Sequence, residues 1–397
     1  MREIESIRLR NFKIFQNVTM KNIPRFSVLV GANGSGKSTF FEVFGFLKDC
    51  LTFTVGSAVQ SRGGYRELVS RNHEDENIGI ELKFRTEIGG IKRRVTYYLE
   101  ISDNNGKTQV AREILRYKRG SYGSPKHFLD FSNGQGIAVV NEEDFSKTKE
   151  KLNEEYQELD RPDILAVKGL GQFQKFRAAK EFRQLIENWY VSDFHINLAR
   201  GSKDAAGYSE HLSPTGENLQ LVAHRLYQEH PEVFRTVMER MKDRIPGISS
   251  VEPEPTRDGR LLLKFQDGSF KDPFIDKYVS DGTIKMFAYL LLLHDPTPHP
   301  LLCVEEPENQ LYPKLLWELA EEFRYYARRG GQVLVSTHSP DFLNAVQVDE
   351  VFWLVKKDGF SQIRRAADDP QIVAFMEEGD QMGYLWKQGF FPDVDPQ

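Results

Sequence analysis

The sequence predicts an α/β protein whose central sheet is largely parallel, and two observations carry this prediction. Short, continuously apolar segments typical of buried strands alternate with longer segments of helical periodicity. One such strand, residues 26–30, runs directly into the glycine-rich stretch GANGSGKST (31–39), which opens an apolar-faced helix. In the second half of the chain, the same alternation predicts a helix at 282–294, a strand at 300–304, a helix at 313–329 and a strand at 332–336.

The N-terminal part is expected to be rich in β-structure. Residues 78–101 alternate apolar and polar positions on either side of Gly89 and Gly90, which predicts a β-hairpin. Further strands are expected within 102–140. We interpret the charge-rich stretch 141–163 as a solvated helix in preference to a mobile insertion.

The middle of the chain, from about 164 to 245, is expected to be helical. Pro231 can occupy the first turn of one of these helices. Residues 251–265 return to a strand pattern. Two helical faces are predicted from apolar spacing, the first carrying Phe182, Leu185, Ile186 and Trp189 and the second Leu219, Val222 and Leu226.

Composition excludes several classes of protein. The 397 residues are 40% hydrophobic and 28% charged, which is typical of a globular chain with a substantial core. Two cysteines, Cys50 and Cys303, are too few for a disulfide framework or a four-cysteine zinc site. The longest apolar run, 287–293, is far shorter than the ~20 residues that span a bilayer. With no signal-peptide core at the N-terminus, these features predict a cytoplasmic protein without a membrane partner.

The stretch 31–39 satisfies the phosphate-binding pattern G-x-x-x-x-G-K-[ST] through Gly31, Gly36, Lys37 and Ser38. The glycines let the backbone curl so that N–H groups point at phosphate, and the following helix adds its positive end. Lys37 then places its charge on the β- and γ-phosphates, and the Ser38 hydroxyl can ligate Mg²⁺. The preceding apolar strand and following helix are the context that this motif requires.

Acidic residues follow the strand at 300–304, as Glu305, Glu306 and Glu308 in EEPE, and His338 follows the strand at 332–336. The carboxyl ends of parallel strands are where α/β sheets bind ligands. One carboxylate can therefore hold Mg²⁺, directly or through water, and the next can polarise an attacking water. We expect His338 to contact the γ-phosphate.

The segment SDGT (280–283) opens a strongly apolar helix, with Ser280 as a natural N-cap. One interpretation is a simple cap over the core. The other is an anion site at a helix N-terminus, which meets a nucleotide held by a second subunit.

Together these segments resemble the ATP-binding-cassette (ABC) ATPases of the SMC/RecF type, and within them the stand-alone, AAA/OLD-like predicted ATPases of bacteria. GANGSGKST is similar to their Walker A motif, LLCVEEPE to Walker B, SDGT to the signature usually written SGG, and STHSP to the switch-histidine motif. The likeness extends, more loosely, from residue 1 to about 355. The stretches LAVKGLGQF and MGYLWKQGFF resemble the stand-alone group.

The resemblance implies an ABC-type ATPase head with a largely parallel P-loop sheet, an antiparallel β subdomain and a helical subdomain. No heptad repeat is sustained, so we expect no long coiled coil. One head should fill residues 1–397. Its expected parts are a P-loop lobe at 1–101, an insertion at 102–163, a helical subdomain at 164–250 and a signature, Walker B and switch-histidine lobe at 251–397.

The resemblance also implies ATP and Mg²⁺ as cofactors and assigns roles to residues. Ser38 and Glu305 would hold the metal, Glu306 would be the general base, and His338 would sense the γ-phosphate. Ser280 and Gly282 would reach the nucleotide of the opposite subunit, and residues 307–311 would cross the dimer interface. The phosphates would be bound by Asn33, Gly34, Ser35, Gly36, Lys37, Ser38 and Thr39.

Three features depart from the family pattern. Glu305 stands where the wider superfamily has Asp, and Asp281 stands where Gly is common, which should place a carboxylate near the phosphates and slow turnover. The glutamine that normally links Mg²⁺ to the helical region has two candidates, Gln60 and Gln172. At the C-terminus, Asp393 and Asp395 resemble a metal-binding pair but are interpreted as an acidic tail.

From the resemblance we expect a slow ATPase that dimerises around ATP and regulates a separate effector, such as a nuclease, in bacterial anti-phage defence. Two alternatives stay open. The first is a RecF-like DNA-repair ATPase, with basic clusters at 92–94 and 116–119 contacting DNA despite the net charge of −5. The second is a nucleotide-dependent scaffold with negligible turnover, for which Asp281 is the hint.

Overall fold

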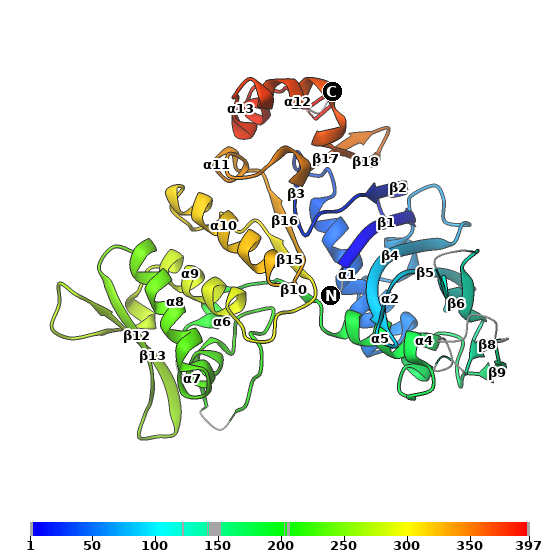
Figure 1. Cartoon of the computed structure of the whole chain (residues 1–397), viewed down its shortest axis with the longest axis horizontal. Helices are drawn as coiled ribbons and strands as arrows, with labels where there is room; N and C mark the ends of the chain where they lie inside the picture. The colour runs from blue at the N-terminus through cyan, green and yellow to red at the C-terminus, as the bar shows by residue number, and fades with distance from the viewer. Residues whose placement is uncertain are drawn as a thin grey trace.

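The structure is a computed structural model that describes residues 3–120, 123–140, 142, 152–201, 203–204 and 207–394. Two large β-sheets with a helix between them make up one side of the molecule, and a lobe of helices with a small sheet makes up the other (Figure 1). The candidate site lies where the strands of the first sheet end.

The first sheet has six strands in the order β10-β15-β16-β3-β17-β18. All neighbours are parallel except β17 and β18, which form an antiparallel pair. This confirms the prediction of a largely parallel sheet. Its strands are β3 (Phe26–Val30), β10 (Tyr190–Val191), β15 (Leu302–Glu305), β16 (Val333–Thr337), β17 (Val351–Lys357) and β18 (Phe360–Arg365).

Helices cover both faces of this sheet, which explains why its strands are apolar at almost every position. Alternate side chains such as Leu29, Cys303 and Leu334 join a core with α1 (Lys37–Thr52). The intervening ones, such as Val304 and Val335, join a second core with α9 (Asp281–Leu293) and α10 (Lys314–Arg328). The buried thiol of Cys303 is thus a packing group, and burial raises its pKa.

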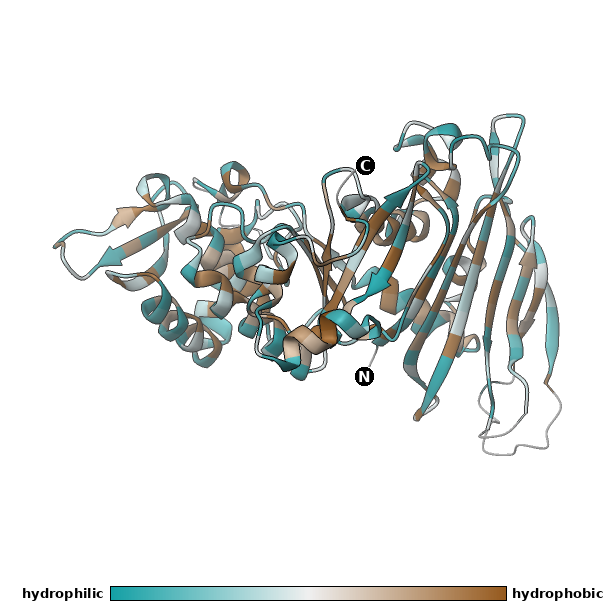
Figure 2. Cartoon of the chain, turned by 90° about the horizontal axis from the view of Figure 1, so that it is seen from above, coloured by the Kyte–Doolittle hydropathy of each residue, from teal (hydrophilic) through white to brown (hydrophobic). Residues whose placement is uncertain are grey.

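The second sheet is antiparallel, in the order β2-β1-β4-β5-β6-β7-β8-β9. The predicted hairpin is its β4–β5 pair, closing at Ile88 and Ile91. Apolar and polar positions alternate along these strands (Figure 2), because one face packs on helices and the other meets solvent. The strands are β1 (Glu3–Phe12), β2 (Phe15–Lys21), β4 (Ile78–Ile88), β5 (Ile91–Asn104), β6 (Lys107–Tyr117), β7 (Lys126–Ser132), β8 (Gln135–Val139) and β9 (Glu154–Glu158).

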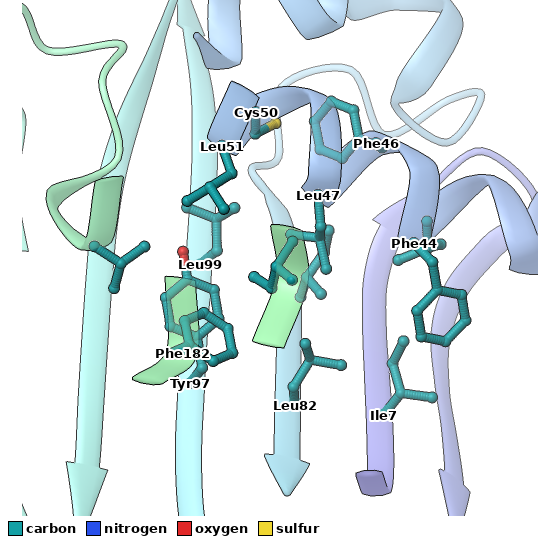
Figure 3. Packing of buried hydrophobic residues seen from close by; sticks show 14 of the residues in the cluster. Ile7, Phe44, Phe46, Leu47, Cys50, Leu51, Leu82, Tyr97, Leu99 and Phe182 are labelled. Carbon is teal, nitrogen blue, oxygen red and sulfur yellow. The ribbon is translucent and has the colours of Figure 1, made fainter. Parts of the chain in front are cut away.

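Helix α1 lies between the two sheets. On its antiparallel-sheet side, Phe44 and Leu47 belong to the same buried cluster as Leu82 and Tyr97 (Figure 3). The helix is thus buried on two sides, and its first residue, Lys37, is itself buried.

The interpretation of 141–163 as a solvated helix is wrong for the residues that the structure describes. Residues 154–158 form β9, which pairs antiparallel with β8 and extends the sheet. The sequence EEYQE is almost entirely exposed, as expected for an edge strand with charged side chains. Residues 141 and 143–151 lie outside the described residues. Within the described residues, the sheet therefore continues beyond residue 101 as β6 to β9, and the division expected at residue 101 falls within β5.

Two buried carboxylates join this sheet to helices α4 (Ala166–Leu170) and α5 (Arg177–Glu187). Glu113 of β6 accepts hydrogen bonds from the backbone N–H groups of Ala166 and Val167, at 2.5 and 3.1 Å. Glu142 accepts one from Ala178, at 2.8 Å. Burial raises the pKa of Glu113 to about 7 and that of Glu142 to about 8. Each satisfies N–H groups that the first helical turn leaves free.

The second lobe contains the helices predicted in the middle of the chain. Helices α7 (Leu219–Glu229) and α8 (Pro231–Arg244) pack on a small antiparallel sheet, and Pro231 occupies the first turn of α8, as predicted. That sheet consists of β11 (Lys203–Asp204), β12 (Ile248–Pro255), β13 (Arg260–Asp267) and β14 (Phe274–Ile275).

The remaining helices are short. They are α2 (Val55–Gln60), α3 (Tyr65–Leu68), α6 (Ile196–Ala199), α11 (Pro340–Leu343), α12 (Pro370–Glu377) and α13 (Met382–Lys387). Within the described ranges the longest helix has 16 residues, so this part of the chain holds no long coiled coil, as expected. No helix in the described ranges is long and apolar enough to cross a bilayer.

Candidate active site

The phosphate-binding loop connects the buried strand β3 to α1. Gly34 and Gly36 adopt φ values of 78° and 101°, in the left-handed region that favours glycine. The Lys37 ammonium folds over the loop and donates hydrogen bonds to the carbonyl oxygens of Gly31 (2.8 Å) and Ala32 (3.3 Å). The first turn of α1 contains no acidic residue, so its positive end is open to an anion.

Neighbouring side chains crowd the position of Gly36. A Cβ there would clash with Cδ1 of Ile14, in the turn between β1 and β2. Ser361 of β18 closes the same region, donating a hydrogen bond to the carbonyl oxygen of Ser35 at 2.6 Å. A cavity of about 510 Å³ adjoins this turn, lined by Lys13, Ile14, Glu67, Val69, Arg71, Asn72, Asp358, Gly359 and Phe360. No local pattern in the sequence indicates this cavity, because three segments far apart in the chain form it.

The hydroxyl of Ser38 donates a hydrogen bond of 2.5 Å to Oε2 of Glu305, at the end of β15. Burial is the main cause that raises the pKa of Glu305, and the Ser38 hydrogen bond opposes it. These two oxygen ligands fit Mg²⁺, which prefers hard oxygen donors and keeps several waters. The described residues contain no cluster of three or more His, Cys, Asp or Glu side chains that would suit a fully protein-bound metal.

Glu306 and His338 face each other across the ends of β15 and β16. Nδ1 of His338 lies 3.2 Å from Oε1 of Glu306, and Nδ2 of Asn309 donates to Oε2 of Glu306 at 3.0 Å. Glu306 adopts a φ of 42°, which is uncommon for a residue with a side chain and costs ~1–3 kcal/mol. The hydrogen bond from its N–H to Ser336 (2.9 Å) helps to hold this backbone, which aims the carboxylate at His338.

Glu308 has a positioning contact that the sequence did not reveal. Its Oε1 accepts hydrogen bonds from the Thr337 hydroxyl (2.6 Å) and from the backbone N–H of His338 (3.2 Å). Glu308 therefore ties the loop after β15 to the turn that carries His338.

Lys37 is the cation at the centre of these acids. Burial lowers its pKa, and the charges of Glu306, Glu308 and Glu305 oppose that shift in decreasing order. The structure thus brings Lys37, Ser38, Glu305, Glu306 and His338 into one polar cluster. Because β3, β15 and β16 are adjacent and parallel, their carboxyl ends meet at one edge of the sheet.

The signature segment lies elsewhere, at the start of α9 (Figure 1). Ser280 caps the helix as predicted, accepting a hydrogen bond of 3.3 Å from the N–H of Thr283. A Cβ on Gly282 would lie 2.6 Å from the carbonyl oxygen of Gln310, so this glycine permits close packing on the loop that follows β15. The Asp281 carboxylate forms an ion pair with Arg200 of the same chain.

A buried lysine links α9 to the same loop. Nζ of Lys285 donates a hydrogen bond of 2.8 Å to the carbonyl oxygen of Asn309. Burial lowers the pKa of Lys285 to about 8, against the opposing charges of Glu308 and Glu306. The sequence analysis missed this residue, although a lysine in an otherwise apolar helix was a visible signal.

The strand beside β15 brings an aspartate to the site instead of a glutamine. β10 runs parallel to β15, and two residues beyond it Asp193 lies close enough for its charge to raise the pKa of Glu305. Gln60 and Gln172, the candidates for the linking glutamine, are both exposed, at the end of α2 and before α5. At the C-terminus, Asp393 pairs with Arg364, and Asp395 lies outside the described residues.

Comparison with known proteins agrees with this architecture. The model of a family described as "AAA domain, putative AbiEii toxin, Type IV TA system" matches residues 26–344, and the chain belongs to that family. No curated protein sequence matches it.

Solved structures show the fold. The chain is similar to an SMC head bound to the C-terminal winged-helix domain of ScpA (13% identity, TM-score 0.52, covering 91% of this chain and 97% of the other). It is also similar to a Pyrococcus furiosus Smc head with an extended coiled coil bound to the C-terminal domain of ScpA (12% identity, TM-score 0.55, 95% and 100% covered). The resemblance to SMC/RecF-like P-loop ATPases is therefore confirmed.

Proposed function

We propose that this member of the AbiEii-like AAA family is a cytoplasmic, ATP-driven switch that dimerises around ATP and regulates a separate effector protein, such as a nuclease, in anti-phage defence. One observation carries the nucleotide part: Lys37, Ser38, Glu305, Glu306 and His338 converge at the ends of three adjacent parallel strands. This combination supplies a phosphate cradle, metal ligands and a candidate base within one site.

Each residue has a role that its contacts support. The loop N–H groups and Lys37 bind the phosphates, and Lys37 exchanges its bonds to the loop carbonyls for bonds to phosphate oxygens. Ser38 and Glu305 would hold Mg²⁺, which supplies charge neutralisation at the phosphates. Glu306, oriented by Asn309, accepts a proton from the attacking water. His338 contacts the γ-phosphate and couples it to Glu306 through the contact between their side chains.

The dimer proposal rests on the separation between this cluster and α9. Gly282 packs against Gln310 of the loop at 306–311. The charges that act on the pKa of Lys37 come from Glu306, Glu308 and Glu305, and none comes from the start of α9. The signature end of α9 is therefore available to the γ-phosphate of a nucleotide held by a second copy. The exposed Ser280 and the cavity of about 790 Å³ in front of it are consistent with such a contact.

Support for the effector and the defence role comes from the comparisons alone. The family description names a toxin–antitoxin system, and both SMC heads were solved with a bound partner protein. The proposed effector partner is tested separately, by affinity capture with and without ATP followed by identification of the bound proteins.

The decisive experiment uses Glu306→Gln, which keeps the site's shape but removes the base. We expect ATP binding to persist, hydrolysis to fall by ~10²–10⁴-fold, and an ATP- and Mg²⁺-dependent dimer to accumulate, as measured by light scattering. Glu377→Gln, an exposed carboxylate on α12, is the matched control and should behave as wild type. A Glu306→Gln protein that stays monomeric with saturating ATP and Mg²⁺ would refute the dimer switch.

A second candidate, DNA repair in the manner of RecF, is favoured by the basic residues that gather on the outer face of the antiparallel sheet. Its distinguishing property would be stimulation of hydrolysis by DNA. The scaffold alternative depended on Asp281, whose charge is balanced by Arg200 within the chain.

A further inference from the structure

Two basic segments that are separate in the sequence meet on the antiparallel sheet. β5 begins with Lys92, Arg93 and Arg94, and the end of β6 with the following turn supplies residues 116–119. They line one cavity of about 600 Å³ with Lys83 of β4. Among the described residues, its lining contains seven basic side chains and no acidic one: Lys83, Lys92, Arg93, Arg94, Arg116, Lys118 and Arg119.

The pleat of the strands directs most of this charge to the solvent side. Lys92 and Arg94 occupy exposed positions of β5 and Thr96 a partly exposed position on the same face, while Val95 and Tyr97 point into the core with α1. The register places Lys83 and Arg116 on either side of Thr96. The basic face is therefore on the opposite side of the sheet from α1, the helix that carries the phosphate-binding loop.

Like charges on neighbouring strands repel, so this arrangement costs stability. Arg94 lies directly opposite Arg85, and Glu5 bridges the two. Glu81 pairs with Lys83 at 3.2 Å and more loosely with Arg116 at 3.6 Å. The ammonium groups of Lys92 and Lys118 have no hydrogen bond or ion pair with the described residues. Glu87 lies opposite Lys92 in the register of β4 and β5. The three acids Glu5, Glu81 and Glu87 thus leave most of the positive charge unbalanced, in a chain whose net charge is −5.

The turn that carries Lys118 is held in place from below. Arg93 is only 7% exposed, and it donates hydrogen bonds to the carbonyl oxygens of Lys118 (2.9 Å) and Arg119 (2.6 Å). Its guanidinium also lies over the ring of Tyr117, 5.4 Å from the centroid. A buried arginine therefore positions the backbone of an exposed basic turn, so that the cations converge on one cavity.

We propose that this cavity is a second phosphate-binding site, independent of the phosphate-binding loop, which takes a phosphate-bearing polyanion. Closely spaced cations facing a cavity complement successive phosphate groups, whether these belong to a nucleic-acid strand or to a free polyphosphate. Binding neutralises the repulsion that the sheet otherwise carries. The proposal goes beyond the ATP-driven switch and does not depend on it.

The test measures binding to the full-length chain carrying Lys37→Ala, which removes the phosphate-loop lysine from the measurement. The probes are inorganic tripolyphosphate, a 20-nucleotide single strand and a 20-base-pair duplex, each between 50 and 200 mM salt. We expect at least one probe to bind with an affinity that falls steeply with salt. Binding of a nucleic-acid strand without binding of tripolyphosphate would identify nucleic acid as the ligand of this cavity. Binding of tripolyphosphate without binding of a strand would identify a free polyphosphate as the ligand.

Lys92→Ala combined with Lys118→Ala should weaken binding about tenfold and lower the salt slope by about 2, because each lysine meets one phosphate. Lys242→Ala combined with Lys271→Ala, two exposed lysines of the other lobe, should change neither quantity. A fold control uses the Lys92/Lys118 double variant with Lys37 intact. An ATP hydrolysis rate and a thermal unfolding temperature equal to those of the wild type would show that the fold is preserved. Equal losses from the two pairs, or no binding of any probe, would overturn the proposal.

Discussion

At the ends of β3, β15 and β16, polar groups converge at one edge of the sheet. At the start of α9, by contrast, each residue has a separate partner within the same chain. Lys37 lies among three carboxylates, and Ser38 and Glu305 converge at 2.5 Å. At α9, Ser280 caps the helix, Asp281 pairs with Arg200, and Gly282 packs on Gln310. The first region is arranged for a ligand held by one chain. The second is a capped helix end whose ligand, in our proposal, comes from a second copy of the chain.

The largest effect is expected in the first region. Lys37→Ala removes the cation that faces the phosphates, and charge-assisted hydrogen bonds of ~1.5–3 kcal/mol are lost. ATP affinity should fall by roughly 100-fold in titration calorimetry. Ser280→Ala, at the other region, should leave the ATP affinity of the monomer unchanged. Comparable losses in the two variants would erase the distinction between the regions.

Gly282→Ala tests the second region. Its added Cβ would lie 2.6 Å from the Gln310 carbonyl oxygen, so α9 or the loop at 306–311 has to shift. We expect ATP-dependent dimerisation to weaken at least tenfold while monomer ATP binding changes less than threefold. Gly268→Ala, where no atom crowds the new Cβ, is the matched control. A Gly282→Ala protein that dimerises normally would contradict the role of this helix end.

Lys285 connects the two regions, and its effect should depend on pH. Its pKa is lowered from 10.5 to about 8 in the folded chain, so between these values the unfolded chain binds more protons and stability rises with pH. Below pH 8 the full cost of burying the cation is present. The free energy of unfolding of Lys285→Met should therefore compare most favourably with that of the wild type at pH 7. The difference between the two free energies should narrow towards pH 10. Urea unfolding at four pH values measures this, and parallel curves would contradict it.

The smallest effect is expected for Asp281→Asn. The Asp281 side chain is half exposed and paired with Arg200, so the ion pair contributes less than about 1 kcal/mol to stability. Turnover should change by less than about threefold in a steady-state phosphate-release assay. A rise of tenfold or more would show that this carboxylate slows hydrolysis, as its place in the signature suggested.

Much of the site was predictable because local rules fix it. The G-x-x-x-x-G-K-S pattern places Gly36 directly before a helix, and this glycine adopts the left-handed conformation that the loop needs there. Continuous apolar strands imply a sheet covered on both faces. Because Glu305 and His338 come where two of these apolar runs stop, they were expected at strand ends. The edge strand at 154–158 could not be predicted, because an almost entirely exposed, charge-rich segment has no apolar periodicity that distinguishes a strand from a helix.

The sequence by itself determined the fold class, the phosphate-binding loop, the acidic strand end and the helix cap at Ser280. Each depends on neighbouring residues and on the periods of helix and strand. Tertiary structure alone decided that Glu308 holds the His338 turn, that Asp193 stands beside Glu305, and that Glu113 serves the first turn of α4. It also joined two basic segments into one cavity. Such contacts depend on strand order and register, which bring together residues far apart in the chain and which no local pattern encodes.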